Sequence, residues 1–160
     1  MLSMQHCDDP LTELEKLPPA TQSGKRTFGC LVDGKAWVTE GITDAGGFYQ
    51  TGTLSVSAGL SNSTFRGNMS FHIFDLDLKV GTYILGEKLN QADSEYARYF
   101  NHKILCEFYT NSVKTGILNI THLDKANFIV SGTFEFEAYS ADCTQIMEVT
   151  NGRFDIDYAA

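Results

Sequence analysis

Hydrophobic and polar residues alternate with a period of two along most of the chain after residue 27. The longest run places Phe134 and Phe136 on one face, and Glu135 and Glu137 on the other. Alternation of this kind is typical of a β-strand with one buried and one solvated side. It predicts strands at residues 28–32, 36–38, 54–58, 65–73, 104–108, 118–121, 128–138, 147–149 and 153–158.

Turn signals separate these runs. Asp33-Gly34 predicts a hairpin, and Asn151-Gly152 predicts a turn before the last strand. Strands at this spacing favour an antiparallel all-β fold, so we expect a two-sheet β-sandwich of about nine or ten strands, with a closed β-barrel as the alternative. The expected domain covers residues 27–160. Residues 1–26 are expected to form an N-terminal tether, and residues 86–101 an irregular or briefly helical segment.

The composition indicates one globular domain and excludes some partners. The chain has 160 residues, of which 42% are hydrophobic and 20% charged, and its net charge is −8. Lys and Arg are scattered, and an anionic surface repels phosphate groups, so we expect no nucleic-acid binding. We also expect no transmembrane span, because no apolar stretch approaches the roughly 18–20 residues that a bilayer requires.

No motif predicts a catalytic, cofactor or metal site. The G-x-S-x-G, G-x-G-x-x-G and P-loop patterns are absent, and no two cysteines form C-x-x-C. Acidic residues do occur two apart, at Asp75/Asp77, Glu135/Glu137 and Asp155/Asp157. Because a solvated strand face gives this spacing by default, we expect these carboxylates to face solvent and the protein to be no enzyme.

Cys30 and Cys106 fall on inward faces of predicted strands that are far apart in the sequence. They could form a disulfide in an oxidising compartment, or remain two buried thiols packed as small hydrophobic residues. We expect the disulfide. Cys143 lies in a predicted turn at residues 140–143 and is expected to be unpaired.

Aromatic residues in the irregular segment suggest a ligand surface. Tyr96, Tyr99 and Phe100 lie in residues 86–101, and binding residues are often carried by loops. Exposed aromatic rings can stack on sugars or line lipid pockets. The alternative is that the three rings cover one end of the core.

Several ordered segments resemble a known family. They are Leu17-Pro-Pro-Ala-Thr-Gln22, Thr27-Phe-Gly-Cys-Leu-Val-Asp-Gly-Lys-Ala-Trp37, Cys106-Glu-Phe-Tyr-Thr110, Gly116-Ile-Leu-Asn-Ile-Thr121, Ile129-Val-Ser-Gly-Thr-Phe-Glu-Phe136 and Thr150-Asn-Gly-Arg-Phe-Asp155. From about Cys7 to its end, the chain resembles small uncharacterised Bacteroidetes-type secreted lipoproteins. The family also carries cysteines at the positions of Cys30 and Cys106.

The resemblance implies a location more than an activity. Members carry a signal peptide that ends with lipid attachment to a cysteine, and Cys7, followed by Asp8-Asp9, stands where that cysteine belongs. We therefore expect an extracytoplasmic protein, anchored by lipid to the outer membrane or cell surface. Residue His6, where a small residue is preferred, and the missing apolar region depart from the pattern. We expect the signal peptide to be missing from this sequence or truncated.

These observations together favour a non-enzymatic cell-envelope domain that acts as a binding or structural module. Its partner would be an envelope glycan, a protein or a small apolar ligand. One alternative is a lipocalin-like carrier, which requires a deep apolar cavity and would be excluded by an interior filled with Phe71, Phe134, Phe136 and Phe154. Another is an envelope glycan hydrolase, which requires titratable groups that converge in a cleft.

Overall fold

The computed structural model describes residues 9–89 and 93–160, and the described chain is almost entirely β-structure. A short 3-10 helix, η1 (Leu14–Lys16), precedes the first strand. The strands are β1 (Thr27–Val32), β2 (Lys35–Val38), β3 (Ala45–Gln50), β4 (Thr53–Ser61), β5 (Arg66–Phe74), β6 (Gly81–Leu85), β7 (Tyr96–Asn101), β8 (Cys106–Tyr109), β9 (Gly116–Asp124), β10 (Ile129–Ser140) and β11 (Gln145–Ala159). The all-β prediction is confirmed.

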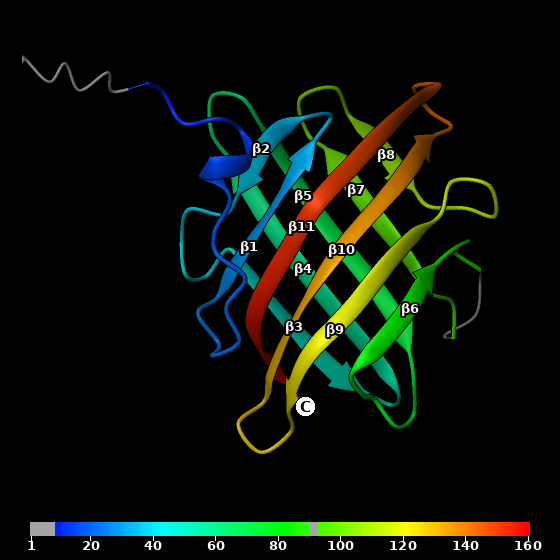
Figure 1. Ribbon diagram of the computed structural model, residues 1–160. Coiled ribbons are helices and arrows are strands. Elements are labelled where there is room, and N and C mark those ends of the chain that lie inside the picture. Colours follow the sequence, from blue (N-terminus) through cyan, green and yellow to red (C-terminus); the bar gives the residue numbers. More distant parts are fainter. Residues whose placement is uncertain (1–8, 90–92) are drawn as a thin grey trace, which may run out of the picture.

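The eleven described strands belong to one hydrogen-bonded sheet rather than to two separate sheets. Their order is β2-β1-β11-β3-β4-β5-β7-β8-β10-β9-β6, and β10 and β11 also pair with each other. Because β10 also pairs with β11, a closed ring of paired strands forms. It consists of β11, β3, β4, β5, β7, β8 and β10. Figure 1 shows β11, β10 and β9 crossing in front of β4, β5 and β7, with the core between the two layers. The sheet is mixed, since β11 and β3 pair in parallel while the other pairs are antiparallel.

The last strand contains a bulge where the sequence predicts a turn. Asn151 has a φ of 53°, and the register of β11 shifts there against β1 and β10. The chain therefore bends at Asn151-Gly152 and continues as the same strand. The turn predicted at this dipeptide is therefore wrong. Asn151 does adopt a left-handed conformation, but it forms a β-bulge, which increases the local twist of the strand, and the chain does not reverse direction.

Alternation does determine which residues face the core. Phe28, Trp37, Phe71, Phe134 and Phe154 are nearly fully buried. The Phe71 ring centroid lies 5.1 Å from that of Phe134 and 5.3 Å from that of Phe154, and Phe28 lies 4.9 Å from Phe134. Phe136 is buried beside Phe134, 6.4 Å between centroids. Packed aromatic rings therefore fill the central interior, which leaves no room there for the deep cavity of a lipocalin-like carrier.

The sequence misses three strands. β3 and β6 follow no clear alternation, and β7 lies inside the segment expected to be irregular. β7 is a strand because its residues pair on both sides, with β5 and with β8. Along β7, buried residues alternate with partly exposed ones over residues 96–100. The prediction that residues 86–101 are irregular or briefly helical is therefore wrong for residues 96–101.

The disulfide joins a different pair of cysteines from the one expected. Cys106, the first residue of β8, is bonded to Cys143 in the turn between β10 and β11, with 5.9 Å between their Cα atoms. Cys30 is a buried free thiol whose Sγ lies 3.9 Å from Sδ of Met69. The predictions of a Cys30–Cys106 bridge and of an unpaired Cys143 are both wrong. β8 pairs with β10, whereas the Cys30 side chain contacts Met69 of β5.

The described residues include no helix with the length and apolar character needed to cross a bilayer. Cys7, the expected lipid-attachment residue, lies outside the described residues.

Candidate functional site

A strip of aromatic and charged side chains covers the outward face of three neighbouring strands and the loop beside them. Antiparallel pairing places His72 of β5 opposite Tyr96 of β7, and Arg98 of β7 opposite Tyr109 of β8. Side chains two apart on a strand point to the same face, so residues 96, 98 and 100 all point away from the core. The outer strip consists of His72, Lys88, Tyr96, Arg98, Phe100, Glu107 and Tyr109.

The rings of the outer strip are in mutual contact. His72 and Tyr96 stack with 4.6 Å between ring centroids and 25° between planes, and Tyr109 is 6.1 Å from Tyr96. Lys88 covers both tyrosines, with its Nζ 4.8 Å from the Tyr109 centroid and 5.7 Å from that of Tyr96. Such cation–π contacts hold an ammonium group over the faces of the rings. The strip is a preassembled aromatic platform.

An ion pair continues the strip across β7 and β8. Nε of Arg98 donates to Oε1 of Glu107, and the Tyr109 hydroxyl donates to the same carboxylate at 2.7 Å. The hydrogen bond from Tyr109, together with that from Arg98, lowers the pKa of Glu107. Burial lowers the pKa of His72, with a further contribution from Lys88 and Arg98. Glu107 is therefore ionised and His72 neutral at neutral pH.

A shallow pocket of about 350 Å³ adjoins the platform. His72 and Tyr96 form one side, and the other lining residues are Phe48, Gln50, Thr51, Thr53, Lys88, Leu89 and Ser94. This pocket therefore combines aromatic faces with hydroxyl and amide groups. Ligand sites of this kind use apolar contact for affinity and a few polar groups for orientation.

The structure separates the three aromatic residues that the sequence grouped as a ligand surface. Tyr99 is 2% exposed and belongs to the core, whereas Tyr96 and Phe100 are half-buried on the outer face. The prediction of one loop surface formed by all three residues is wrong, because they lie on a strand and successive residues of a strand point to opposite faces. Sequence reasoning also missed His72, Lys88 and Tyr109, whose proximity depends on strand pairing.

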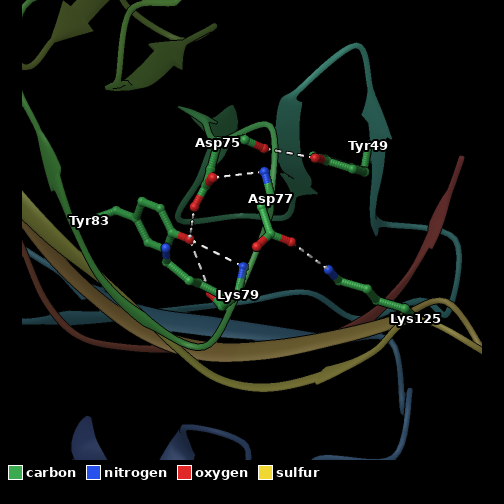
Figure 2. A network of polar contacts seen from close by, with 6 residues as sticks. All are labelled: Tyr49, Asp75, Asp77, Lys79, Tyr83 and Lys125. Atoms are coloured by element: carbon green, nitrogen blue, oxygen red, sulfur yellow. Dashed lines mark hydrogen bonds and ion pairs between the residues drawn. The ribbon is translucent and has the colours of Figure 1, made fainter.

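A second polar network fastens one end of the sheet (Figure 2). Asp75 accepts a hydrogen bond from the Tyr83 hydroxyl at 2.9 Å and from the main-chain nitrogen of Asp77 at 2.9 Å. Tyr49 donates to the main-chain oxygen of Asp75, and Lys125 lies 3.4 Å from Asp77. Burial, with the hydrogen bond to Asp75, raises the pKa of Tyr83 to about 12. The network connects β3, β6 and the β9–β10 turn. We therefore assign it a structural role.

Members of the other two acidic pairs are also held by neighbouring groups. Glu137 pairs with Lys114 at 2.9 Å, and Asp157 pairs with Arg26 at 2.6 Å. Asp155, expected to face solvent, is 1% exposed. This expectation was wrong because residues of the expected tether cover Asp155. Within residues 9–89 and 93–160, no group of three His, Cys, Asp or Glu side chains could hold a metal ion.

Asp155 holds the segment before β1 against the sheet. Its carboxylate accepts hydrogen bonds from the hydroxyls of Thr21 and Ser131, both at 2.7 Å. It also accepts three from main-chain nitrogens of residues 23–25, at 2.8 to 3.1 Å. Burial opposes ionisation, but these hydrogen bonds outweigh it and lower the pKa of Asp155 to about 2. We call residues 21–25 the N-terminal clasp.

Comparison with known proteins identifies a family without a known activity. No curated protein and no solved structure matches the chain significantly. Residues 25–155 match the family described as a domain of unknown function, DUF6252. The match includes all the strands that carry the outer strip, from β5 to β8. Because it spans most of the chain, this protein belongs to the DUF6252 family.

Proposed function

We propose that this protein is a non-enzymatic binding module of the cell envelope, and that its outer strip binds a carbohydrate. The observation that supports this most directly is the stacked pair of His72 and Tyr96 beside a pocket with hydroxyl and amide groups. A sugar ring presents apolar C–H groups on its face and hydroxyls on its rim. Those two surfaces complement an aromatic platform flanked by polar side chains.

The location outside the cytoplasm is supported by the cysteine chemistry. Disulfides persist in oxidising compartments and are rare in the reducing cytosol, so the Cys106–Cys143 bond is consistent with an extracytoplasmic protein. Lipid attachment at Cys7 and placement at the outer membrane or cell surface remain part of the proposal. They are supported by the resemblance to secreted lipoproteins.

The charges of the strip support binding rather than catalysis. The carboxylate of Glu107 is engaged by Arg98 and Tyr109, and its lowered pKa keeps it ionised, which suits a hydrogen-bond acceptor and not a general acid. The lowered pKa of His72 likewise leaves a neutral ring that can stack.

Isothermal titration with soluble β-glucan, chitin, xylan and α-glucan oligosaccharides tests the proposal. At least one oligosaccharide should bind the wild-type protein, and Tyr96→Ala should weaken its affinity about 10-fold, as expected for loss of one aromatic contact. Phe128→Ala is the matched control, because Phe128 is an exposed aromatic residue in the β9–β10 turn. Absence of binding by the wild-type protein, or equal loss in both variants, would contradict the proposal.

A further inference from the structure

A second and larger pocket opens on the face of the sheet that carries the outer strip. Its volume is about 810 Å³, and it lies against outward residues of β3, β4 and β5. Its lining includes Gly46, Ser57, Gly59, Ser61, Asn68 and His102. We call it the second pocket, and we call the pocket of about 350 Å³ beside His72 and Tyr96 the first pocket.

Strand pairing shows that the two pockets follow each other along the same face. Phe48 of β3 lines the first pocket, and Gly46, two residues before it, lines the second. Residues two apart on a strand share a face. Antiparallel pairing places Gly46 opposite Ser57, and Ser57 opposite Ser70 of β5. A row of three small residues therefore forms the floor next to the first pocket.

This floor is open to solvent. A Cβ atom at Gly46 would meet nothing within 4 Å, and one at Gly59 would meet only Oδ1 of Asn68, at 3.5 Å. We call the two pockets and the floor that connects them the outer groove. It follows β4 from Thr53 in the first pocket to Ser61 in the second. A strand of nine residues spans about 25 Å, so the groove is several times longer than a single sugar ring.

A ring pair lies at each end of the outer groove. His72 and Tyr96 stack at the first pocket. Phe100 of the outer strip contacts His102 edge to face, with 4.6 Å between ring centroids, and His102 lines the second pocket. Tyr96 and Phe100 lie four residues apart on β7, which corresponds to about 13 Å along the strand. The aromatic contact is therefore repeated along the groove.

The charges along the outer groove favour an uncharged ligand. Apart from histidines, the charged side chains that line the two pockets are Glu40 and Asp44, which are acidic, and Arg66 and Lys88, which are basic. These charges balance, so the groove offers no continuous cationic track. An anionic chain would meet both carboxylates of the second pocket, and the net charge of −8 would repel it further.

We propose that the outer groove binds a neutral polysaccharide chain lengthwise, across both pockets. This inference rests on the proposed carbohydrate function and specifies the form of the ligand. The ring pairs at the two ends can each contact the face of a sugar unit, and the hydroxyl and amide groups of the floor can bond the hydroxyls between them. A disaccharide would occupy one pocket and leave the other empty.

Isothermal titration with chains of two and of six sugar units tests this requirement for length. The probes are β-glucan, chitin, xylan and α-glucan oligosaccharides, with six-unit oligogalacturonate as the anionic comparison. In the family that binds, the six-unit chain should bind at least about 10-fold more tightly than the two-unit chain, because it also reaches the second ring pair. Oligogalacturonate should bind at least about 10-fold more weakly than the neutral six-unit chain.

Gly46→Ile should close the groove between the two pockets. Its branched side chain is stiff and suits a strand, and the space above residue 46 is open. The six-unit chain should lose its advantage, while the two-unit chain should bind as it does to the wild type. Thr133→Ile is the matched control, because residue 133 points outward from β10 in the other layer of the sheet (Figure 1). It should keep the advantage.

Two substitutions on β7 separate the ends of the groove. Phe100→Ala should remove the advantage of the six-unit chain and leave the two-unit chain unaffected. Tyr96→Ala should weaken both lengths, since it removes the contact that both chains use. An unchanged thermal midpoint in Phe100→Ala and Gly46→Ile would show that the loss comes from the groove and not from unfolding.

Equal affinities for the two lengths would overturn lengthwise binding and leave the carbohydrate function intact. So would an advantage that persists in Gly46→Ile and Phe100→Ala. Binding of oligogalacturonate as tight as that of the neutral chain would overturn the assignment of an uncharged ligand. Absence of binding by every chain, at both lengths, would instead contradict the proposed function itself.

Discussion

The carboxylate of Asp155 shows how much a single residue can contribute to the stability of this fold. Asp155 lies on β11, yet its five hydrogen bonds reach β10 and the N-terminal clasp. Hydrogen bonds to a charged group are stronger than neutral ones, and three of the five come from main-chain N–H groups of the N-terminal clasp. The segment before β1 is therefore part of the folded domain.

Replacing Asp155 with Asn should destabilise the protein by about 2–4 kcal/mol, because the amide nitrogen cannot accept the hydrogen bonds that a carboxylate oxygen accepts. Urea denaturation at neutral pH measures this change. Asp157→Asn is the control, since Asp157 forms an exposed ion pair and should cost no more than about 1 kcal/mol. Equal effects of the two substitutions would contradict the role assigned to Asp155.

The contribution of Asp155 to the free energy of unfolding should decrease at acidic pH. The pKa of Asp155 is about 2 in the folded protein, against 3.8 ordinarily. Folding favours the ionised carboxylate. Its stabilisation of the folded state is therefore nearly complete above about pH 4, and it is lost as the pH falls from about 4 to about 2. That contribution is about 2 kcal/mol. The difference in unfolding free energy between wild type and Asp155→Asn should therefore narrow over this range.

At the scale of the element, β11 determines how the sheet closes. It pairs with β1, with β10 and, at its end, with β3. The bulge at Asn151 allows this long strand to bend and to pair with all three neighbours. Gly152 is required beside it, because a Cβ atom there would lie 2.5 Å from the Phe134 ring and 2.6 Å from the main-chain oxygen of Phe134.

Gly152→Ala should therefore destabilise the protein by about 1–3 kcal/mol, the usual cost of overpacking a core position. Gly46→Ala on β3 is a matched control. A Cβ atom at residue 46 meets nothing within 4 Å, so this change should stay within about 0.5 kcal/mol. Denaturant titration of both variants compares them directly, and similar midpoints would show that the bulge tolerates a side chain.

For the whole molecule, the disulfide connects parts of the sheet that are distant in sequence. Cys106 and Cys143 are separated by 37 residues, and the bond fastens the start of β8 to the β10–β11 turn. Burial raises the pKa of the Cys30 thiol, which makes this third cysteine unreactive in the folded protein.

Cys143→Ser should lower stability by about 2–4 kcal/mol, since a cross-link over this separation restricts the unfolded chain. The wild-type thermal midpoint should fall when a reductant is added, and that of Cys143→Ser should not. Cys30→Ala should keep the full response to reductant. If Cys30→Ala lost that response, Cys30 and not Cys143 would be the partner of Cys106.

Local alternation of hydrophobic and polar residues was enough to predict the all-β class and most of the core. Alternation is a local property, so Phe134 and Phe136 could be assigned inward and Glu135 and Glu137 outward without knowing their neighbours. β3, β6 and β7 were missed because hydrophobic and polar residues do not alternate clearly along their sequences.

Which strands lie side by side depends on long-range pairing and is seen in the three-dimensional structure alone. A period of two carries no information about which strand pairs with which, or in what register. For this reason the Cys106–Cys143 bond, the burial of Asp155 and the outer strip could not be predicted. Each of these features joins side chains that are distant in sequence, and they meet only because the strand pairing of the sheet brings them together.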